Sequence, residues 1–185
     1  MNTPITTDVA ILGGGLAGLS LAIQLKRRLG DALSITVIER NCHPVDEAAH
    51  KVGESTVELS SYYFANVLGL KDHLSRQQLP KLGLRFFFRS EKQLREQPLH
   101  EQIEFGARVF PHSPSYQLDR GIFENFLAEQ AQQLGVHFVD GTKVTDIAIG
   151  KEDEGHRVHT LHLASEARNT YQCRYLVDAC SRKSP

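Results

Sequence analysis

Three glycines near the amino terminus have the spacing of a dinucleotide-binding loop. Gly13, Gly15 and Gly18 form a GxGxxG pattern between a short apolar run and a segment with helical periodicity. In this pattern the first glycine permits a tight turn, the second lets a pyrophosphate approach the backbone, and the third brings helix and strand together. Glu39 ends the next apolar run, where its carboxylate can accept hydrogen bonds from ribose hydroxyls. The pattern predicts a dinucleotide with a free 2′-hydroxyl, the alternative being a purely structural glycine-rich turn.

Lys81 is the second residue with a chemical use, because it precedes the apolar stretch LGLRFFF. Read as one strand over residues 79–88, the stretch places apolar side chains on one face and Lys81 with Arg85 on the other. The phenylalanines are expected to line the core or an aromatic pocket. A lysine held partly out of water tends to have a lowered pKa and altered reactivity. The alternative is an exposed strand lysine whose stem covers apolar surface while its charge reaches solvent.

The elements that position these residues begin with a strand, a helix and a second strand. The sequence predicts a strand at residues 8–12, a helix at 16–29 with Gly30 as its C-cap, and a strand at 34–40. This order predicts an α/β fold with a parallel sheet.

The middle of the chain is predicted to be less regular. Residues 41–53 form a long polar loop, after which Ser55 and Glu58 have the form of a capping box for a helix through residues 57–69. The polar residues 89–102 are expected to form an excursion or a hairpin.

The last third of the chain changes from helix to strands. A helix is predicted at residues 120–134, followed by strands at 136–140, 142–149, 157–164 and 170–179. The last three strands form a meander, and the final one could rejoin the parallel sheet.

Composition narrows the function classes. The 185 residues are 41% hydrophobic and 23% charged with a formal net charge of -1, which indicates a globular protein and no nucleic-acid partner. Three cysteines without CxxC spacing favour a reduced, cytoplasmic protein, and nine histidines lack the spacing of metal ligands. The first apolar run is too short and too rich in glycine to span a bilayer, so no membrane partner is expected.

The motifs taken together resemble those of one enzyme family. GGGLAGLS, VIER, VGEST, KLGLRF, YQLDR and YLVDA are similar to the flavin-dependent, tryptophan-halogenase-like members of the FAD-dependent oxidoreductases and monooxygenases. The resemblance implies an N-terminal portion of such a protein: a Rossmann-like, aromatic-hydroxylase-like FAD-binding domain over residues 1–185. It places the dinucleotide fingerprint within residues 1–40 and the start of an inserted, substrate-side region at residues 79–118. The family's tryptophan-bearing signature, halide site and C-terminal elements would lie beyond residue 185, as expected of a truncated form.

The resemblance also implies FAD as the cofactor and names its contacts. The ADP half would meet Gly13, Gly15, Ala17, Gly18, Glu39 and Arg40, and the flavin would meet Gly53, Glu54, Ser55 and Arg120. Val144 falls where the family's backbone meets adenine. Structural alternatives remain: Ser55 as part of the helix cap, Arg120 paired with Glu124 one turn later, and Val144 as core.

In the family, reduced flavin, oxygen and halide yield a hypohalous acid that reaches a lysine in the context matched by Lys81. The implied function is halogenation of an electron-rich aromatic, free or carrier-bound, with reduced flavin supplied by a separate reductase. Alternatives are a monooxygenase or reductase of the same fold, or a non-catalytic nucleotide-binding fragment.

The sequence departs from the family pattern at two places. FFRS follows KLGLRF, which disfavours tryptophan as the substrate. Asp178 is followed by ACSRKSP where the family has ASGR, and a non-glycine residue at the tight position predicts strain in that turn.

Overall fold

A computed structural model describes residues 3–89, 98–150, 159–164 and 170–181. The chain divides into two compact units, which are described separately: unit 1 comprises Met1–Lys51 with Asp119–Pro185, and unit 2 comprises Val52–Leu118. Unit 1 contains the glycine-rich loop, and unit 2 contains Lys81.

Unit 1 is built on one six-stranded sheet with strand order β7-β2-β1-β10-β9-β8. Strand β1 pairs in parallel with both β2 and β10, and β2 pairs in parallel with β7. Strand β9 lies antiparallel between β10 and β8. The strands are β1 (Ile5–Leu12), β2 (Ile35–Ile38), β7 (His137–Val139), β8 (Val144–Ala148), β9 (His159–Leu163) and β10 (Thr170–Asp178). The predicted α/β class, the meander and the return of the last strand to the parallel sheet are confirmed. The two turns that connect the strands of the meander lie outside the described residues.

The predicted strand-helix-strand order is present in β1, α1 (Leu16–Leu29) and β2. Strand β1 begins three residues before the predicted start, because Ile5 already pairs with Tyr171 of β10. Gly30 is the C-cap of α1 as predicted, and its N–H donates to the Lys26 carbonyl. A short 3-10 helix, η1 (Gly30–Ala32), leads into β2.

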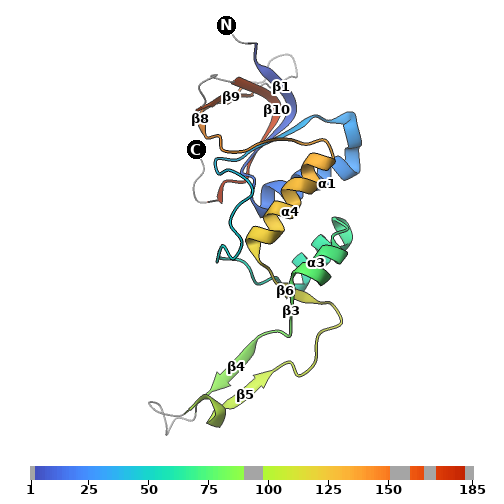
Figure 1. Ribbon diagram of the computed structural model, residues 1–185, viewed down its shortest axis with the longest axis vertical. Coiled ribbons are helices and arrows are strands. Elements are labelled where there is room, and N and C mark those ends of the chain that lie inside the picture. Colours follow the sequence, from blue (N-terminus) through green and yellow to red (C-terminus); the bar gives the residue numbers. More distant parts are fainter. Residues whose placement is uncertain (1–2, 90–97, 151–158, 165–169, 182–185) are drawn as a thin grey trace. The chain divides into compact units, whose positions relative to one another are not determined.

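Helix α4 (Arg120–Gln133) packs along α1, and Figure 1 shows the two helices side by side. Asp119 is its N-cap, and the carboxylate accepts the Ile122 N–H at 3.0 Å and the Ala48 N–H at 2.8 Å. Burial raises the pKa of Asp119, but these hydrogen bonds outweigh it and leave the pKa below its ordinary value. The cap therefore fixes both the start of α4 and the end of the loop before unit 2.

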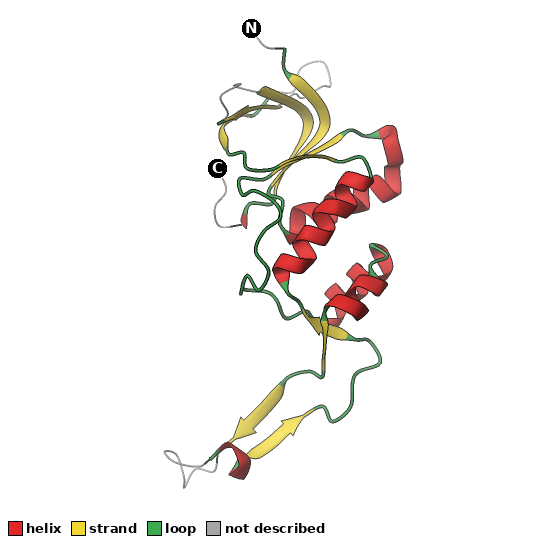
Figure 2. Ribbon diagram, viewed as in Figure 1, coloured by secondary structure: helices red, strands yellow, loops and turns green. Residues whose placement is uncertain are grey.

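Unit 2 contains short helices and two small sheets (Figure 2). Its elements are α2 (Glu58–Tyr62), the π-helical turn η2 (Tyr63–Val67), α3 (Lys71–Gln77), β3 (Leu79–Lys81), β4 (Arg85–Phe88), the 3-10 turn η4 (Leu99–Glu101), β5 (Ile103–Gly106) and β6 (Ser115–Gln117). Helix α3 was not predicted from the sequence.

The predicted capping box at Ser55 is wrong. Helix α2 begins at Glu58, and the Val57 N–H donates to the Ser60 hydroxyl at 3.2 Å. Ser55 instead forms an isolated bridge with Gln117, so it belongs to extended chain.

The prediction of one strand over residues 79–88 is also wrong. The chain breaks at Gly83, whose φ of 126° few other residues adopt, and the two halves pair with different partners. Strand β3 pairs with β6, whereas β4 pairs with β5 in a hairpin. Residues 89–102, expected to form an excursion or a hairpin, connect β4 and β5; residues 90–97 lie outside the described residues, so the expectation stays a prediction. The three phenylalanines of β4 are exposed instead of lining a core or pocket; they are Phe86, Phe87 and Phe88.

Candidate functional site

Two glycines of the fingerprint are required by close backbone packing. A side-chain carbon on Gly18 would lie 2.0 Å from the Gly13 carbonyl oxygen. One on Gly13 would lie 2.7 Å from the carbonyl oxygen of Ala179, which follows β10. Real side-chain carbons essentially never come within 3.0 Å of a non-bonded atom. The absence of a side chain at Gly18 therefore lets α1 approach the loop after β1, and its absence at Gly13 lets that loop approach the residue after β10.

Gly15 differs from these two glycines because space is open above it. A side-chain carbon there would have as its neighbour the Glu124 Oε1 at 3.7 Å, an ordinary contact. Gly15 is the N-cap of α1, and it supplies no side-chain hydrogen bond to the first turn, which contains no acidic residue. Ala17, in the first turn, is exposed. Open backbone at a helix N-terminus fits a pyrophosphate, so the residues present fit the ADP half of a dinucleotide.

The Glu39 carboxylate is buried and held by three hydrogen bonds. Its Oε2 accepts the Gly14 N–H at 2.6 Å. Its Oε1 accepts hydrogen bonds from the Asn41 backbone N–H at 2.9 Å and from the Asn41 Nδ2 at 2.7 Å. Each carboxylate oxygen has two lone pairs, so these contacts leave Oε2 able to accept a ribose hydroxyl. Arg40 is exposed beside it.

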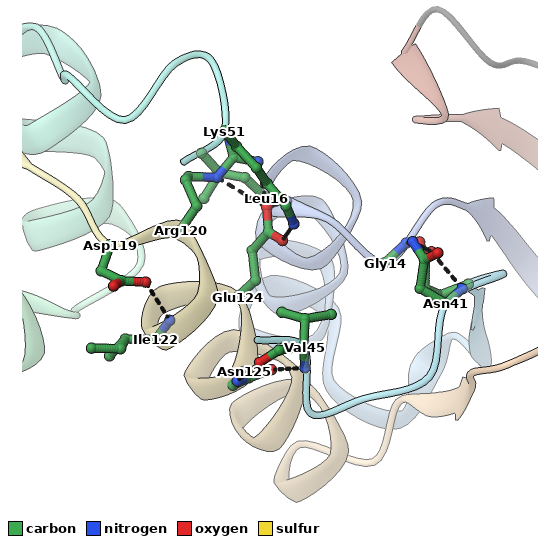
Figure 3. Close-up of polar contacts among 11 residues, drawn as sticks. Gly14, Leu16, Asn41, Val45, Lys51, Asp119, Arg120, Ile122, Glu124 and Asn125 are labelled. Carbon is green, nitrogen blue, oxygen red and sulfur yellow. Dashed lines mark hydrogen bonds and ion pairs between the residues drawn. The ribbon is translucent and has the colours of Figure 1, made fainter. Parts of the chain in front are cut away.

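Arg120 and Glu124 form an ion pair, which was the structural alternative to the predicted flavin contact of Arg120. The Arg120 Nε lies 2.9 Å from Glu124 Oε1, and an Nη2 contact joins the same oxygen. The Glu124 Oε1 also accepts the Leu16 N–H at 3.3 Å, and Oε2 accepts from Lys51 Nζ at 2.5 Å. Figure 3 shows this group at the start of α1. The flavin contact of Arg120 stays a prediction.

The Lys81 ammonium in unit 2 is held by two oxygen acceptors. Its Nζ lies 2.8 Å from the Ser55 hydroxyl and also donates to the Thr56 carbonyl. Lys81 is half-buried, which is compatible both with the predicted catalytic role and with a strand lysine whose stem covers apolar surface, so the catalytic role stays a prediction. Sequence reasoning placed Ser55 beside the flavin and Lys81 at the substrate, without expecting contact between them.

The loop that holds Lys81 is fixed by β6 and by a buried hydroxyl. The Thr56 hydroxyl accepts the Tyr116 N–H at 2.7 Å and donates to the Tyr116 carbonyl at 2.9 Å. The Glu54 carbonyl accepts the Leu118 N–H at 2.7 Å. Gly53 is exposed with a φ of 92°. The flavin contacts predicted for Gly53 and Glu54 stay predictions.

Val144 belongs to the core of unit 1. Its side chain packs in the cluster formed by Ala10, Leu12, Ile38, Val144, Leu161, Leu163, Tyr171 and Cys173. The structural alternative therefore accounts for its side chain, and the backbone contact with adenine stays a prediction.

The turn after β10 has the strain that the sequence predicted. Ser181 has a φ of 59°, a conformation that favours glycine. Burial, followed by the nearby charge of Asp178, raises the pKa of the Cys180 thiol to about 11. The Cys180 N–H donates to Asp178 Oδ1 at 2.8 Å, which closes the turn.

Two kinds of site have no support in the described part of the chain. Its histidine, cysteine and carboxylate side chains form no group that could hold a metal ion. No helix among the described residues has the length and apolarity needed to cross a bilayer.

Comparisons with known proteins find the same architecture. A family model described as an FAD binding domain matches residues 6–185. The flavin-dependent halogenase chlA of Dictyostelium discoideum is 30% identical over 95% of this chain, and the alignment spans 31% of chlA. The flavin-dependent halogenase malA of Malbranchea aurantiaca is 28% identical over 76% of this chain and 20% of malA. The chain thus spans a third or less of these relatives.

Solved structures agree on the fold. The myxobacterial chondrochloren halogenase CndH superposes with a TM-score of 0.70 at 24% identity, covering 95% of this chain and 37% of CndH. The halogenase PltM, solved with phloroglucinol and FAD, gives 0.71 at 19% identity, covering 97% of this chain and 35% of PltM.

Proposed function

The chain belongs to the FAD binding domain family, with FAD as its cofactor, and from this premise we propose a halogenase function. The proposed reaction uses reduced FAD, oxygen and halide to halogenate an electron-rich aromatic. The observation that carries the proposal is the Lys81 ammonium, which the Ser55 hydroxyl and the Thr56 carbonyl hold. Lys81 lies in the KLGLRF motif, which resembles the corresponding motif of the halogenases. Relatives such as chlA are flavin-dependent halogenases.

An ammonium is suited to hold a diffusible oxidant. Lys81 has three N–H donors, and two are directed at the Ser55 and Thr56 oxygens, so the third can donate to an incoming hypohalous acid. Binding the oxidant in one orientation beside the substrate raises its effective concentration there. The acceptors thus restrict the ammonium to one position, which a lysine free in solvent would not keep.

The cofactor supplies a hypohalous acid when reduced FAD, oxygen, halide and a proton give oxidised FAD, HOX and water. At the aromatic carbon, a C–X bond then forms and a C–H bond breaks. The oxygen of HOX leaves as water with the proton that the carbon has lost. Lys81 donates a hydrogen bond to the HOX oxygen, which makes the halogen more electrophilic.

The proposal includes three partners or settings. The substrate is a small aromatic, either free or bound to a carrier. Since the sequence has one dinucleotide fingerprint, a separate reductase supplies the reduced flavin. The proposed setting is the cytoplasm, and the three free cysteines are consistent with it.

A second candidate is an FAD-dependent monooxygenase or reductase of the same fold. It is favoured by the similarity to a flavoprotein/dehydrogenase from Cytophaga hutchinsonii, which has a TM-score of 0.65 at 19% identity over 92% of this chain and 38% of that one. In that case Lys81 has no role in halide chemistry. A non-catalytic nucleotide-binding role is the third candidate, and it predicts FAD binding without turnover.

The test compares Lys81→Met with Lys71→Met in the full chain, supplied with reduced FAD, bromide and phenolic substrates. Lys71 is an exposed lysine at the start of α3 and serves as the control. Mass spectrometry should detect a brominated product from wild type and from Lys71→Met, and at least about 100-fold less from Lys81→Met, while flavin oxidation is unchanged. Hydroxylated product instead would favour the monooxygenase, and equal bromination by both variants would remove Lys81 from the mechanism.

A further inference from the structure

The buried Glu124 carboxylate collects two cations at the start of α1. Its side chain is 2% exposed, whereas those of Arg120 and Lys51 are 15% and 41% exposed. The carboxylate is therefore the innermost of the three groups, and the Lys51 ammonium is the outermost. All three lie in unit 1, and Figure 3 shows them beside Leu16.

The position of this group coincides with the open side of the fingerprint. Glu124 Oε1 lies 3.3 Å from the Leu16 nitrogen and 3.7 Å from the point where a Gly15 side chain would begin. Gly15 is the glycine whose missing side chain lets a pyrophosphate approach. Two cations and one carboxylate leave a net positive charge here, which adds to the positive end of the α1 dipole.

Anchoring the preceding loop does not require the Lys51 ion pair. The loop is already joined to α4 by Val45 N–H to Asn125 Oδ1 and by Asn125 Nδ2 to the Val45 carbonyl, each at 2.8 Å. The Ala48 N–H donates to the Asp119 carboxylate at 2.8 Å. Figure 3 shows the Val45 contact to Asn125 beside the ion-paired group. These hydrogen bonds hold the loop on α4 independently of the Lys51 ion pair.

We propose that Lys51 binds the FAD pyrophosphate and that Glu124 is the positioning residue that holds its ammonium, together with Arg120, at the fingerprint. The partly exposed ammonium can donate to a phosphate oxygen while Glu124 stays in its buried place. This inference goes beyond the proposed function, since it concerns cofactor affinity and holds for any reaction carried out by the flavin.

The test measures dissociation constants of the full chain for FAD by flavin fluorescence, and for ADP and adenosine by calorimetry. Lys51→Met should weaken FAD and ADP about 10- to 100-fold, because a charge-assisted hydrogen bond is lost. Adenosine binding should not change, since adenosine has no phosphate. Lys51→Arg should restore most of the affinity, and Lys71→Met is the matched control.

Glu124→Gln tests the positioning role separately. It keeps an acceptor for the Leu16 N–H and loses the charge that holds both cations, so FAD and ADP should bind more weakly while the melting curve still shows a cooperative fold. Tighter binding would show that the carboxylate competes with the pyrophosphate and would overturn the positioning role. Unchanged FAD and ADP affinity in Lys51→Met would overturn the inference alone, whereas a wild-type chain that binds neither would overturn it together with the cofactor assignment.

Discussion

Replacing Gly15 or Gly18 with alanine should separate cofactor binding from folding, although both glycines belong to one motif. At Gly15 the backbone φ is -86°, which alanine adopts freely, and the added carbon would have its contact at 3.7 Å. At Gly18 the added carbon would lie 2.0 Å from the Gly13 carbonyl oxygen. Gly15→Ala is therefore compatible with the folded structure but reduces the space above the backbone at the start of α1. Gly18→Ala instead produces a steric clash with the backbone of Gly13.

The magnitudes follow from these distances. The Gly18→Ala contact must open from 2.0 Å to at least 3.0 Å, so helix α1 and its loop must separate by about 1 Å. Overpacking of this kind costs about 1–3 kcal/mol. In a chain of this length each kcal/mol lowers Tm by about 2–4 °C, which gives a total of about 2–12 °C. Gly15→Ala should change stability much less, because the gain of about 0.4–1 kcal/mol from a more restricted unfolded chain is offset by the poorer fit of alanine at an N-cap.

Gly15→Ala, which has the smaller effect on stability, should directly weaken FAD binding. In Gly15→Ala the methyl group takes space that the pyrophosphate needs, at a cost of about 1–3 kcal/mol, which is about 5- to 150-fold in Kd. Thermal melts without ligand and fluorescence titrations with FAD measure the two quantities on the same samples. The reasoning is refuted if Gly15→Ala binds FAD as wild type does, or if Gly18→Ala melts at the wild-type temperature.

Two further predictions concern the turn after β10. The Cys180 thiol, with a pKa raised to about 11, should react with iodoacetamide at pH 8 more slowly than the exposed Cys42, and equal rates by peptide mass spectrometry would contradict this. Because the folded pKa exceeds the ordinary value of 9.0, the unfolded thiol ionises first. The stability that the raised pKa contributes is therefore present below pH 9 and lost as the pH rises to about 11. Ser181→Gly should relieve about 1–2 kcal/mol of left-handed strain, offset by about 0.4–1 kcal/mol from the freer unfolded chain. A net rise of a few degrees in Tm is expected, and a fall would show that the positive φ of Ser181 is not strained.

The parts of the fold that followed from sequence are those with a regular apolar period. Helix α1 has the predicted bounds, Leu16–Leu29, and α4 ends at Gln133, one residue before the predicted end. Helix α3 was missed because Leu74 is its one buried residue, so it has no apolar stripe to detect. The break at Gly83 was missed because β3 and β4 each pair with a different strand, and pairing partners cannot be read from local alternation.

The candidate site shows the same division between local and long-range information. The tight turn at Gly13 and the packing role of Gly18 could be predicted, because their spacing reflects one local turn; the contact of Gly13 with Ala179 could not. Lys51 and Glu124 were not singled out for the site, since they are 73 positions apart and meet only when the loop before unit 2 packs on α4. Asn41 was missed as well, although it lies two residues after Glu39 and holds that carboxylate with two hydrogen bonds.

The end of β10 connects the departures from the family pattern with the cofactor loop. The Ala179 N–H donates to the Leu12 carbonyl at 2.8 Å, and the Ala179 carbonyl occupies the place of a Gly13 side chain. Ser181, with its positive φ, follows two residues later. The Gly13 backbone thus lies in close contact with the residue after β10 on one side and with the first turn of α1 at Gly18 on the other. A shift of either element would therefore displace the Gly13 loop and the other element. The geometry offered to the pyrophosphate is therefore fixed by β1, α1 and β10 together, which is why a substitution at Gly18 is expected to act on the whole fold.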